Sequence, residues 1–431
     1  MAYRRFLSAV GRRRQRPYLR RQTEEVQSDQ AVIPLNAGLA HPALFPYRTA
    51  TLRLQDGRQV ELGEEIMQEV QQYSNTTGYP PFRDWCKNFI LEHHSPPCWG
   101  RGENATDVIV TNGAAEAAFK VLEMCLETDD TIIVQNPTYA SAIDLVQALG
   151  AKPVGVPGDG RGLSPLHLRE TLSKWTPDEV KDPNSDFPKL MYLVPTGGNP
   201  TGENMTLERK QEIYAIAKEF DLLILEDDPY YFVQYTDSRV PSFLSIDTDG
   251  RVMRADSFSK TVSPGLRLGI LSGPAPLVDK IVAHIGSTQE HSSNLSQVAL
   301  LMALEAWGQD GFQEHVKKIQ SVYKEQRDAM QSSAEKWLSG LAEWDLPEAG
   351  IYFWIRIKDV QDSRKIVEEV RKHYQIGVSP GFAFSTKPSD PSPFVRVSFS
   401  YVAPDTIDFA FQKLADVIRE TQKTERREYG T

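Results

Sequence analysis

Several features typical of particular protein classes are absent from this chain. Only 3 of its 431 residues are cysteine. Cys86, Cys98 and Cys125 have no metal-ligand spacing, so the sequence predicts no metal site and suits a reducing compartment. No apolar run is long enough to cross a bilayer, and no internal repeat is present. The net charge of −10 argues against a general nucleic-acid surface, while 40% hydrophobic content is enough for a large core in more than one structural unit.

Acidic residues are also missing from residues 1–23, where the arginines are concentrated. With Phe6, Leu7 and Val10 interspersed, this composition is typical of a mitochondrial presequence. The segment 1–30 is therefore interpreted as a basic arm or presequence. It predicts a mitochondrial matrix protein, with the cytoplasm as the alternative.

The middle of the chain alternates strand-like and helix-like segments, which predicts an α/β fold with a mostly parallel sheet. The expected strands are Val108–Thr111, Thr131–Gln135, Leu190–Pro195 and Leu222–Glu226, and the expected helices begin at Ala114, Ser141 and Leu207. The amphipathic run Phe312–Gly340 is expected to link the large domain to a smaller carboxy-terminal one.

Two further segments are interpreted from their polarity. The pair His93-His94 lies in a polar stretch and is expected on a solvated helix face. The polar end of the chain, Thr421–Thr431, is expected to be disordered.

One motif and its upstream partners indicate chemistry. Lys260 closes Ser257-Phe258-Ser259-Lys260, and Arg267 follows seven residues later. Asp227 ends a buried strand, with Tyr230 three residues on, and Asn199 lies in a glycine-rich turn. A lysine that carries pyridoxal 5′-phosphate needs a cation for the phosphate, a carboxylate for the ring nitrogen and donors for the ring phenolate. Arg267, Asp227, Tyr230 and Asn199 are candidates for these tasks.

Each of these residues has an ordinary structural explanation when taken alone. A lone lysine is mostly solvated surface, an aspartate after a strand is often a helix cap, and Asn-Pro among glycines is usually a turn. Their order along the chain, each after a strand-like run, is far less common by chance. The combined pattern favours an enzyme.

The longest matching segments are Glu226–Phe232, Arg254–Lys260 and Trp337–Trp344. Through them the chain resembles the class I pyridoxal-phosphate aminotransferases of the aspartate aminotransferase fold, most of all the kynurenine/α-aminoadipate aminotransferases. The resemblance implies a large cofactor-binding domain over 61–325, with a mostly parallel seven-stranded sheet. It implies a smaller α/β domain built from 31–60 and 326–431.

The resemblance also implies how the cofactor is held. Lys260 would bind it covalently and then move the proton between the substrate Cα and the cofactor carbon. The phosphate would lie at the start of the helix after Asn112-Gly113, held by Ser257, Arg267 and the backbone N–H groups of Ala114 and Ala115. Relatives carry polar side chains at these two alanines. Tyr139 would stack on the pyridine ring.

Substrate contacts follow from the same resemblance. Arg396, in a strand of alternating apolar residues, would bind the α-carboxylate through two parallel hydrogen bonds. Tyr73 would reach the phosphate of a neighbouring subunit, which implies a homodimer. Gly38 and Tyr352 would line the substrate pocket. The residues expected to contact both cofactor and substrate are Tyr73, Tyr139 and Asn199.

Arg20 has two conflicting interpretations. It lies in the presequence-like segment, yet it matches an arginine that in the family pairs with the distal carboxylate of α-aminoadipate on a mobile arm. The hypothesis is that Arg20 belongs to the mature enzyme and selects acidic side chains. The alternative is an excised or solvated basic segment.

The predicted reaction is a ping-pong transamination. It would move the amino group of L-kynurenine, L-2-aminoadipate and other, aromatic, amino acids to 2-oxoglutarate or another 2-oxo acid. The alternatives are a narrower aromatic aminotransferase, a lyase with the same cofactor and fold, and an aminotransferase-like transcription regulator. The last is disfavoured because the short arm before Gly38 leaves no room for a DNA-binding domain.

Overall fold

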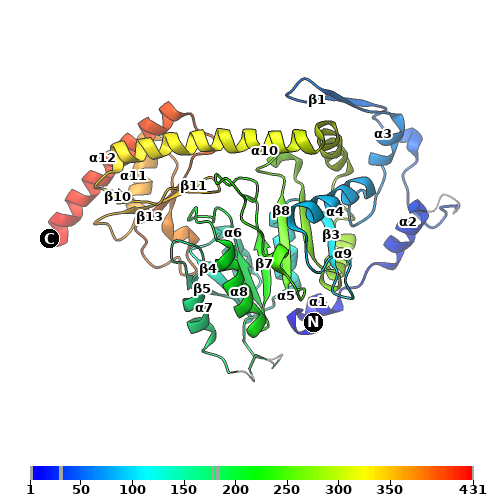
Figure 1. The fold of residues 1–431 in the computed structure, drawn as a ribbon, viewed down its shortest axis with the longest axis horizontal. Helices are drawn as coiled ribbons and strands as arrows, with labels where there is room; N and C mark the ends of the chain where they lie inside the picture. Colours follow the sequence, from blue (N-terminus) through cyan, green and yellow to red (C-terminus); the bar gives the residue numbers. More distant parts are fainter. Residues whose placement is uncertain (1–2, 29–32, 177–178, 181, 183–184, 430–431) are drawn as a thin grey trace.

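The computed structural model describes residues 3–28, 33–176, 179–180, 182 and 185–429. A seven-stranded sheet lies at the centre of the larger domain, and a four-stranded sheet forms the smaller one (Figure 1). None of the helices within the described residues combines the length and apolar content needed to cross a membrane. The same residues contain no group of three or more His, Cys, Asp or Glu side chains placed to hold a metal.

The central sheet has the strand order β3-β9-β8-β7-β6-β4-β5. Its strands are β3 (Thr106–Thr111), β4 (Thr131–Asn136), β5 (Lys152–Pro157), β6 (Leu190–Leu193), β7 (Leu223–Asp227), β8 (Val252–Ser257) and β9 (Gly269–Pro274). Only β9 runs antiparallel to its neighbours, so the other six strands point the same way. The predicted mostly parallel α/β fold is confirmed.

Helices cover both faces of this sheet. One face packs against α5 (Ala114–Cys125), α6 (Ala140–Ala148) and α9 (Ala275–Thr288). The other packs against α3 (Glu64–Val70), α4 (Pro80–His94), α7 (Pro165–Leu172), α8 (Leu207–Glu219) and the start of α10 (Asn294–Leu338). The strands are apolar along nearly their whole length because both of their faces are buried.

The amino-terminal segment is part of this domain. It forms η1 (Tyr3–Phe6), α1 (Ala9–Arg13) and α2 (Tyr18–Ser28). Tyr3, Phe6 and Leu7 are buried in the core beside α5, and the Tyr3 hydroxyl donates to the Gly250 carbonyl at 2.8 Å. A segment with presequence-like composition therefore completes one face of the large domain.

The long helix α10 joins the two domains and runs along the top of Figure 1. Gly308 interrupts it with φ 64°, a left-handed conformation that glycine adopts without steric cost. The smaller sheet has the order β10-β11-β13-β12 and comprises β10 (Ala342–Glu343), β11 (Tyr352–Ile357), β12 (Ser379–Pro380) and β13 (Phe394–Ser398). It packs with α11 (Arg364–Tyr374) and α12 (Pro404–Tyr429) around a separate core.

The hairpin of β1 (Ala50–Arg53) and β2 (Gln59–Leu62) differs from its predicted place. Residues 31–60 were expected to belong to the smaller domain. Ala50 and Leu52 instead pack on the core of the large domain. The Trp307 indole, on α10 just before the interruption at Gly308, also donates to Asp56 at 3.2 Å.

Two predictions from polarity are wrong. His94 is buried at the end of α4, 2% exposed, with Nδ1 2.9 Å from the Ser242 hydroxyl and its ring against Tyr231. Its polar neighbours in sequence face elsewhere on the helix. The polar stretch expected to be disordered, Thr421–Thr431, is helical as far as Tyr429; Gly430 and Thr431 lie outside the described residues. Thr421 and Gln422 are buried, and Gln422 donates to the Lys358 carbonyl at 2.7 Å.

Candidate active site

Four strands of the central sheet lead directly to predicted site residues. β3 leads to Ala114 and β6 to Asn199, while β7 ends at Asp227 and β8 at Ser257. These strands are parallel to one another, so their carboxyl ends lie along one edge of the sheet. Open α/β sheets bind their ligands at this edge.

Asp227 is a buried carboxylate at the end of β7. It is 6% exposed, and its Oδ2 accepts a hydrogen bond from the Tyr192 hydroxyl at 2.7 Å. Burial raises the pKa of Asp227 from 3.8 to about 6, while the Tyr192 hydrogen bond lowers it. Within the described residues no cation forms an ion pair with Asp227. The site therefore offers a desolvated acid to a basic or cationic ligand.

Tyr230 lies three residues beyond Asp227, in the loop after β7. It is 3% exposed, and its ring meets that of Tyr352 edge to face with centroids 6.2 Å apart. Burial, and then the neighbouring Tyr352, hold the pKa of the Tyr230 phenol well above its ordinary value. Tyr230 stays protonated and can donate a hydrogen bond to an anionic oxygen.

The start of α5 forms a concave site for an anion. Gly113 has φ 94°, and a Cβ at this position would lie 2.6 Å from Arg267 Nη2. The Arg267 guanidinium donates to the Asn112 carbonyl at 3.0 Å, directly beside the first helical turn. Within the described residues it has no carboxylate partner. A guanidinium and free backbone N–H groups together favour a phosphate here.

The two alanines at this helix start differ in exposure. Ala114 is buried and Ala115 is exposed. Neither side chain can donate a hydrogen bond, so any contact with an anion must come from their backbone N–H groups.

Lys260 is half-buried in the turn that follows β8. The Ser257 hydroxyl accepts from the Ser259 N–H at 3.1 Å, which closes this turn. The His315 Nε2 lies 2.7 Å from the Thr261 carbonyl and attaches the loop to α10. The turn thus holds Lys260 at the same sheet edge as Asp227.

Arg396 lies in the middle of β13 in the smaller domain. Its Nη1 donates to Asn199 Oδ1 at 2.8 Å and its Nη2 to Ser379 Oγ at 3.3 Å. The guanidinium stacks between the rings of Tyr352 and Phe384, 4.2 and 4.6 Å from their centroids. Within the described residues Arg396 has no acidic partner. Its charge is positioned but not neutralised, as binding of a carboxylate requires.

The loop that carries Tyr139 also contacts the smaller domain. Tyr139 is half-buried at the start of α6, and the adjacent Thr138 N–H donates to the Phe384 carbonyl at 3.0 Å. Gly197 and Gly350 meet backbone to backbone, since a Cβ on Gly197 would lie 2.4 Å from the Gly350 nitrogen. Loops of both domains therefore enclose the sheet edge.

Three predicted site residues lie elsewhere. Arg20 is buried on α2, where it donates to Thr76 Oγ1 at 3.0 Å and forms an ion pair with Glu290 at 3.2 Å. Tyr73 is 47% exposed. Gly38 is exposed, and a Cβ there would meet nothing within 4 Å. Arg20 and the Tyr73 segment are adjacent, since Arg20 also donates to the carbonyl of Ser74.

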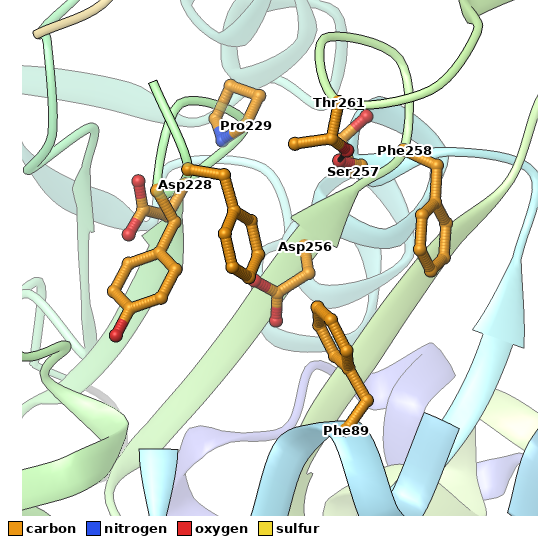
Figure 2. Close-up of a pocket in the computed structure, with 9 residues that line it drawn as sticks. Phe89, Asp228, Pro229, Asp256, Ser257, Phe258 and Thr261 are labelled. Carbon is orange, nitrogen blue, oxygen red and sulfur yellow. Dashed lines mark hydrogen bonds between the residues drawn. The ribbon is translucent and has the colours of Figure 1, made fainter. Parts of the chain in front are cut away.

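A buried ion cluster supports the strand ends from the opposite face. Arg254, on β8, pairs with Glu226, Asp228 and Asp256 at 3.1, 2.9 and 2.6 Å. Neighbouring residues of a strand point to opposite faces, so Glu226 and Asp227 diverge. Figure 2 shows Asp228 and Asp256 lining a small pocket below Ser257, among aromatic rings. This pocket is part of the buried ion cluster that supports the strand ends.

Sequence reasoning missed three residues that contact the site: Tyr192, Ser379 and Phe384. Tyr192 lies inside an apolar strand and resembles any core tyrosine. Ser379 and Phe384 approach Arg396 because β12 and the short helix η5 (Gly381–Phe384) pack beside β13. Only Tyr192 carried a local signal: its hydroxyl lies one residue before the end of the buried strand β6, and the neighbouring strand β7 ends in Asp227.

The sequence profile of the family described as aminotransferase class I and II matches residues 44–414. The chain belongs to this family. This aminotransferase is 42% identical over 424 residues to the mitochondrial kynurenine/alpha-aminoadipate aminotransferase of Bos taurus, covering 98% of this chain and 100% of that protein. It is 34% identical to an aromatic amino acid aminotransferase of Dictyostelium discoideum, covering 92% of this chain and 83% of the other.

Among solved structures, the aminotransferase Aro8 of Candida albicans superposes on this aminotransferase with a TM-score of 0.86 at 26% identity, covering 97% and 98% of the two chains. The kynurenine aminotransferase of Pyrococcus horikoshii superposes with a TM-score of 0.73 at 25% identity, covering 97% and 98%. The predicted family and its enzymatic activity, transamination, are confirmed.

Proposed function

We propose that this aminotransferase transfers the amino group of L-kynurenine, L-2-aminoadipate and further aromatic amino acids to 2-oxoglutarate or another 2-oxo acid. The observation that carries the proposal is the convergence of Asp227, Lys260 and Arg267 on one sheet edge, closed by Arg396 from the smaller domain. The Bos taurus relative named above, aligned over all of its length, supports the choice of donors. The Dictyostelium relative supports a narrower, aromatic range as the second candidate.

We infer that the cofactor is pyridoxal 5′-phosphate. Bound, it would supply an electron sink that stabilises the carbanion formed when the substrate loses its Cα proton. The Arg267 guanidinium and the start of α5 suit its phosphate, and the buried Asp227 suits its ring nitrogen. A solved structural relative, described as the kynurenine aminotransferase of Pyrococcus horikoshii with PMP, supports a cofactor of this class.

The protein side of the reaction follows from these positions. Arg396 binds the substrate α-carboxylate through both of its terminal nitrogens, and Asn199 fixes the orientation of the guanidinium. Lys260 Nζ would move a proton between the substrate Cα and the cofactor carbon, away from Cα in the first half of the cycle and back to Cα in the second. Tyr230 would donate a hydrogen bond to the cofactor phenolate, and Tyr139 would hold the pyridine ring by stacking. The walls formed by Tyr352 and Phe384 exclude water from the carboxylate site.

We propose further that the working enzyme is a homodimer in which Tyr73 reaches the phosphate of the partner's site. Large apolar side chains are exposed along the same part of the chain: Leu19, Leu35, Leu44 and Tyr47. These side chains are available to be covered by a partner subunit, and covering them would remove apolar surface from water. The proposed location is the mitochondrion, supported by the presequence-like composition of the first residues and by the mitochondrial relatives.

The test is the absorbance spectrum of the purified protein with pyridoxal phosphate, before and after kynurenine or aminoadipate is added without an acceptor. Conversion to the pyridoxamine form supports transamination, and the two rates rank the donors. In Lys260→Ala the cofactor should still bind, while turnover should fall by about 10²–10⁴-fold because the acid–base group is lost. Full activity of this variant would exclude Lys260 as the catalytic residue.

A further inference from the structure

Tyr192 places a hydroxyl in the core directly behind the candidate cofactor site. It lies on β6, between β7 and β4, and is 1% exposed. A buried phenol needs a hydrogen-bond partner, and here the partner is Asp227 Oδ2 at 2.7 Å. Burial, and then the charge of Asp227, hold the pKa of Tyr192 well above its ordinary value, so the phenol remains a donor.

The two carboxylate oxygens of Asp227 are used unequally. Within the described residues, Oδ2 accepts from Tyr192, whereas Oδ1 accepts no hydrogen bond. The other charged groups that act on Asp227 are Asp228, in the next position, and Arg254, on β8. Their charges are opposite in sign, and they pair with each other at 2.9 Å. Tyr192 is therefore the side chain that decides which oxygen remains for a ligand.

The same proton can occupy either of two places when a pyridine ring faces a buried carboxyl group. It can remain on the carboxyl, which gives a neutral pair, or move to the ring nitrogen, which gives an ion pair. A buried site of low polarity favours the neutral pair. A hydrogen bond donated to the carboxylate stabilises only the ion pair.

We propose that Tyr192 is a positioning residue of the transamination: its hydroxyl fixes Asp227 with Oδ1 toward the ring nitrogen and keeps the shared proton on that nitrogen. This inference rests on the proposed function, because it assigns Asp227 to the cofactor ring. The protonated ring is the form that withdraws electrons from the substrate Cα. Tyr192 thus acts on catalysis through Asp227, without contact with the substrate.

The experiment compares the wild-type holoenzyme with Tyr192→Phe, each loaded with ¹⁵N-pyridoxal phosphate. The variant removes one hydroxyl and retains the ring, so core packing is preserved. The ¹⁵N chemical shift of the ring nitrogen should move from the protonated position in the wild type toward the unprotonated position in the variant. The turnover number should fall by about 10- to 100-fold, the effect of losing one hydrogen bond to a charged group.

Tyr214→Phe is the matched control. Tyr214, on α8, is also a buried tyrosine that donates to a carboxylate, Asp247 at 3.0 Å, but it lies away from the sheet edge. This variant should lose thermal stability and leave the ¹⁵N shift unchanged. Tyr192→Gln, which restores a donor, should recover part of the protonated signal.

The outcomes separate this inference from the proposed function. If the wild type shows the protonated nitrogen and Tyr192→Phe leaves both the shift and the turnover unchanged, the role of Tyr192 is refuted while the enzyme assignment stands. If Tyr214→Phe moves the shift as far as Tyr192→Phe does, the effect is general loss of packing and the inference is also refuted. A wild-type protein that binds no cofactor would instead refute the proposed function.

Discussion

Deletion of residues 1–14 should destabilise the large domain, although the composition of this segment is that of a cleavable presequence. Tyr3, Phe6 and Leu7 are 7%, 0% and 6% exposed and lie in the core beside α5. The Ser8 N–H also donates to the Met124 carbonyl at 2.9 Å, at the end of the same helix. Their removal would expose one face of α5 to water.

The magnitude follows from the buried side chains. Full burial of a large apolar side chain contributes about 1.5–3 kcal/mol, so three of them contribute roughly 5–9 kcal/mol as an upper bound. Whole domains are stable by only about 5–15 kcal/mol. The deletion should therefore lower the Tm of the holoenzyme by up to about 10–20 °C. Phe6→Ala alone should cost about 3–5 kcal/mol.

The assay is thermal unfolding of the full-length protein, the deletion and Phe6→Ala, with intact-mass analysis of the protein isolated from its native cells. Val10→Ala is the control in the same segment, because Val10 is 50% exposed and its truncation should leave the Tm unchanged. The mature protein should retain Phe6 and Leu7. A deletion that unfolds within about 2 °C of the full-length protein would refute the packing argument.

Three other predictions concern the site. Arg396→Lys should lower kcat/KM for every donor by about 10- to 100-fold, since a point charge cannot replace the paired bonds of a guanidinium, and should leave the cofactor spectrum intact; a loss of less than about twofold would contradict the assignment. The folded-state pKa of Asp227, about 6, lies above its ordinary 3.8, so the folded apoprotein binds this proton more tightly than the unfolded chain does. The stabilisation that this bound proton gives to the folded state is then complete below about pH 4 and is lost as the pH rises through about 6. The free energy of unfolding falls by up to about 3 kcal/mol over this range. The free energy of unfolding of the Asp227→Asn apoprotein, measured by denaturant titration across this pH range, should not show that decrease. Equal pH profiles for the wild-type and variant apoproteins would show that the Asp227 carboxyl is ionised throughout. In this structure Arg20 pairs with Glu290. If it instead pairs with the distal carboxylate of aminoadipate during the reaction, as the family match implies, Arg20→Ala should lower kcat/KM for aminoadipate relative to kynurenine by about tenfold. Arg21 is adjacent and exposed, so the control Arg21→Ala should leave the ratio of the two kcat/KM values unchanged. If Arg20→Ala also leaves this ratio unchanged, Arg20 does not select acidic donors.

The sequence predicted the central strands accurately, and with them the shared sheet edge at which Asp227, Ser257 and Asn199 lie. Strand-like runs predict buried parallel strands, and the carboxyl ends of such strands meet at one edge. The expected strand Leu222–Glu226 lies one residue before the observed β7. The order of the strands in the sheet, by contrast, could not be predicted from any local sequence pattern.

Predictions from local polarity failed where tertiary packing decided the outcome. His94 is polar and has polar neighbours in sequence, yet its side of α4 faces the core of the large domain. The carboxy-terminal stretch is polar, yet two of its residues pack against the rest of the chain and extend α12. The β1–β2 hairpin precedes the large domain in sequence but packs on its core and on α10.

The sequence by itself determined which groups are available for chemistry: the amine of Lys260, the carboxylate of Asp227 and the guanidinium groups of Arg267 and Arg396. It did so because the chemistry of a side chain and its place next to a strand-like run are both local properties of the chain. Only the tertiary structure decided what surrounds these groups, including the Tyr192 hydroxyl on Asp227 and the Phe384 ring on Arg396. These contacts join elements far apart in the chain, and the direction of a hydrogen bond or a ring depends on how those elements pack.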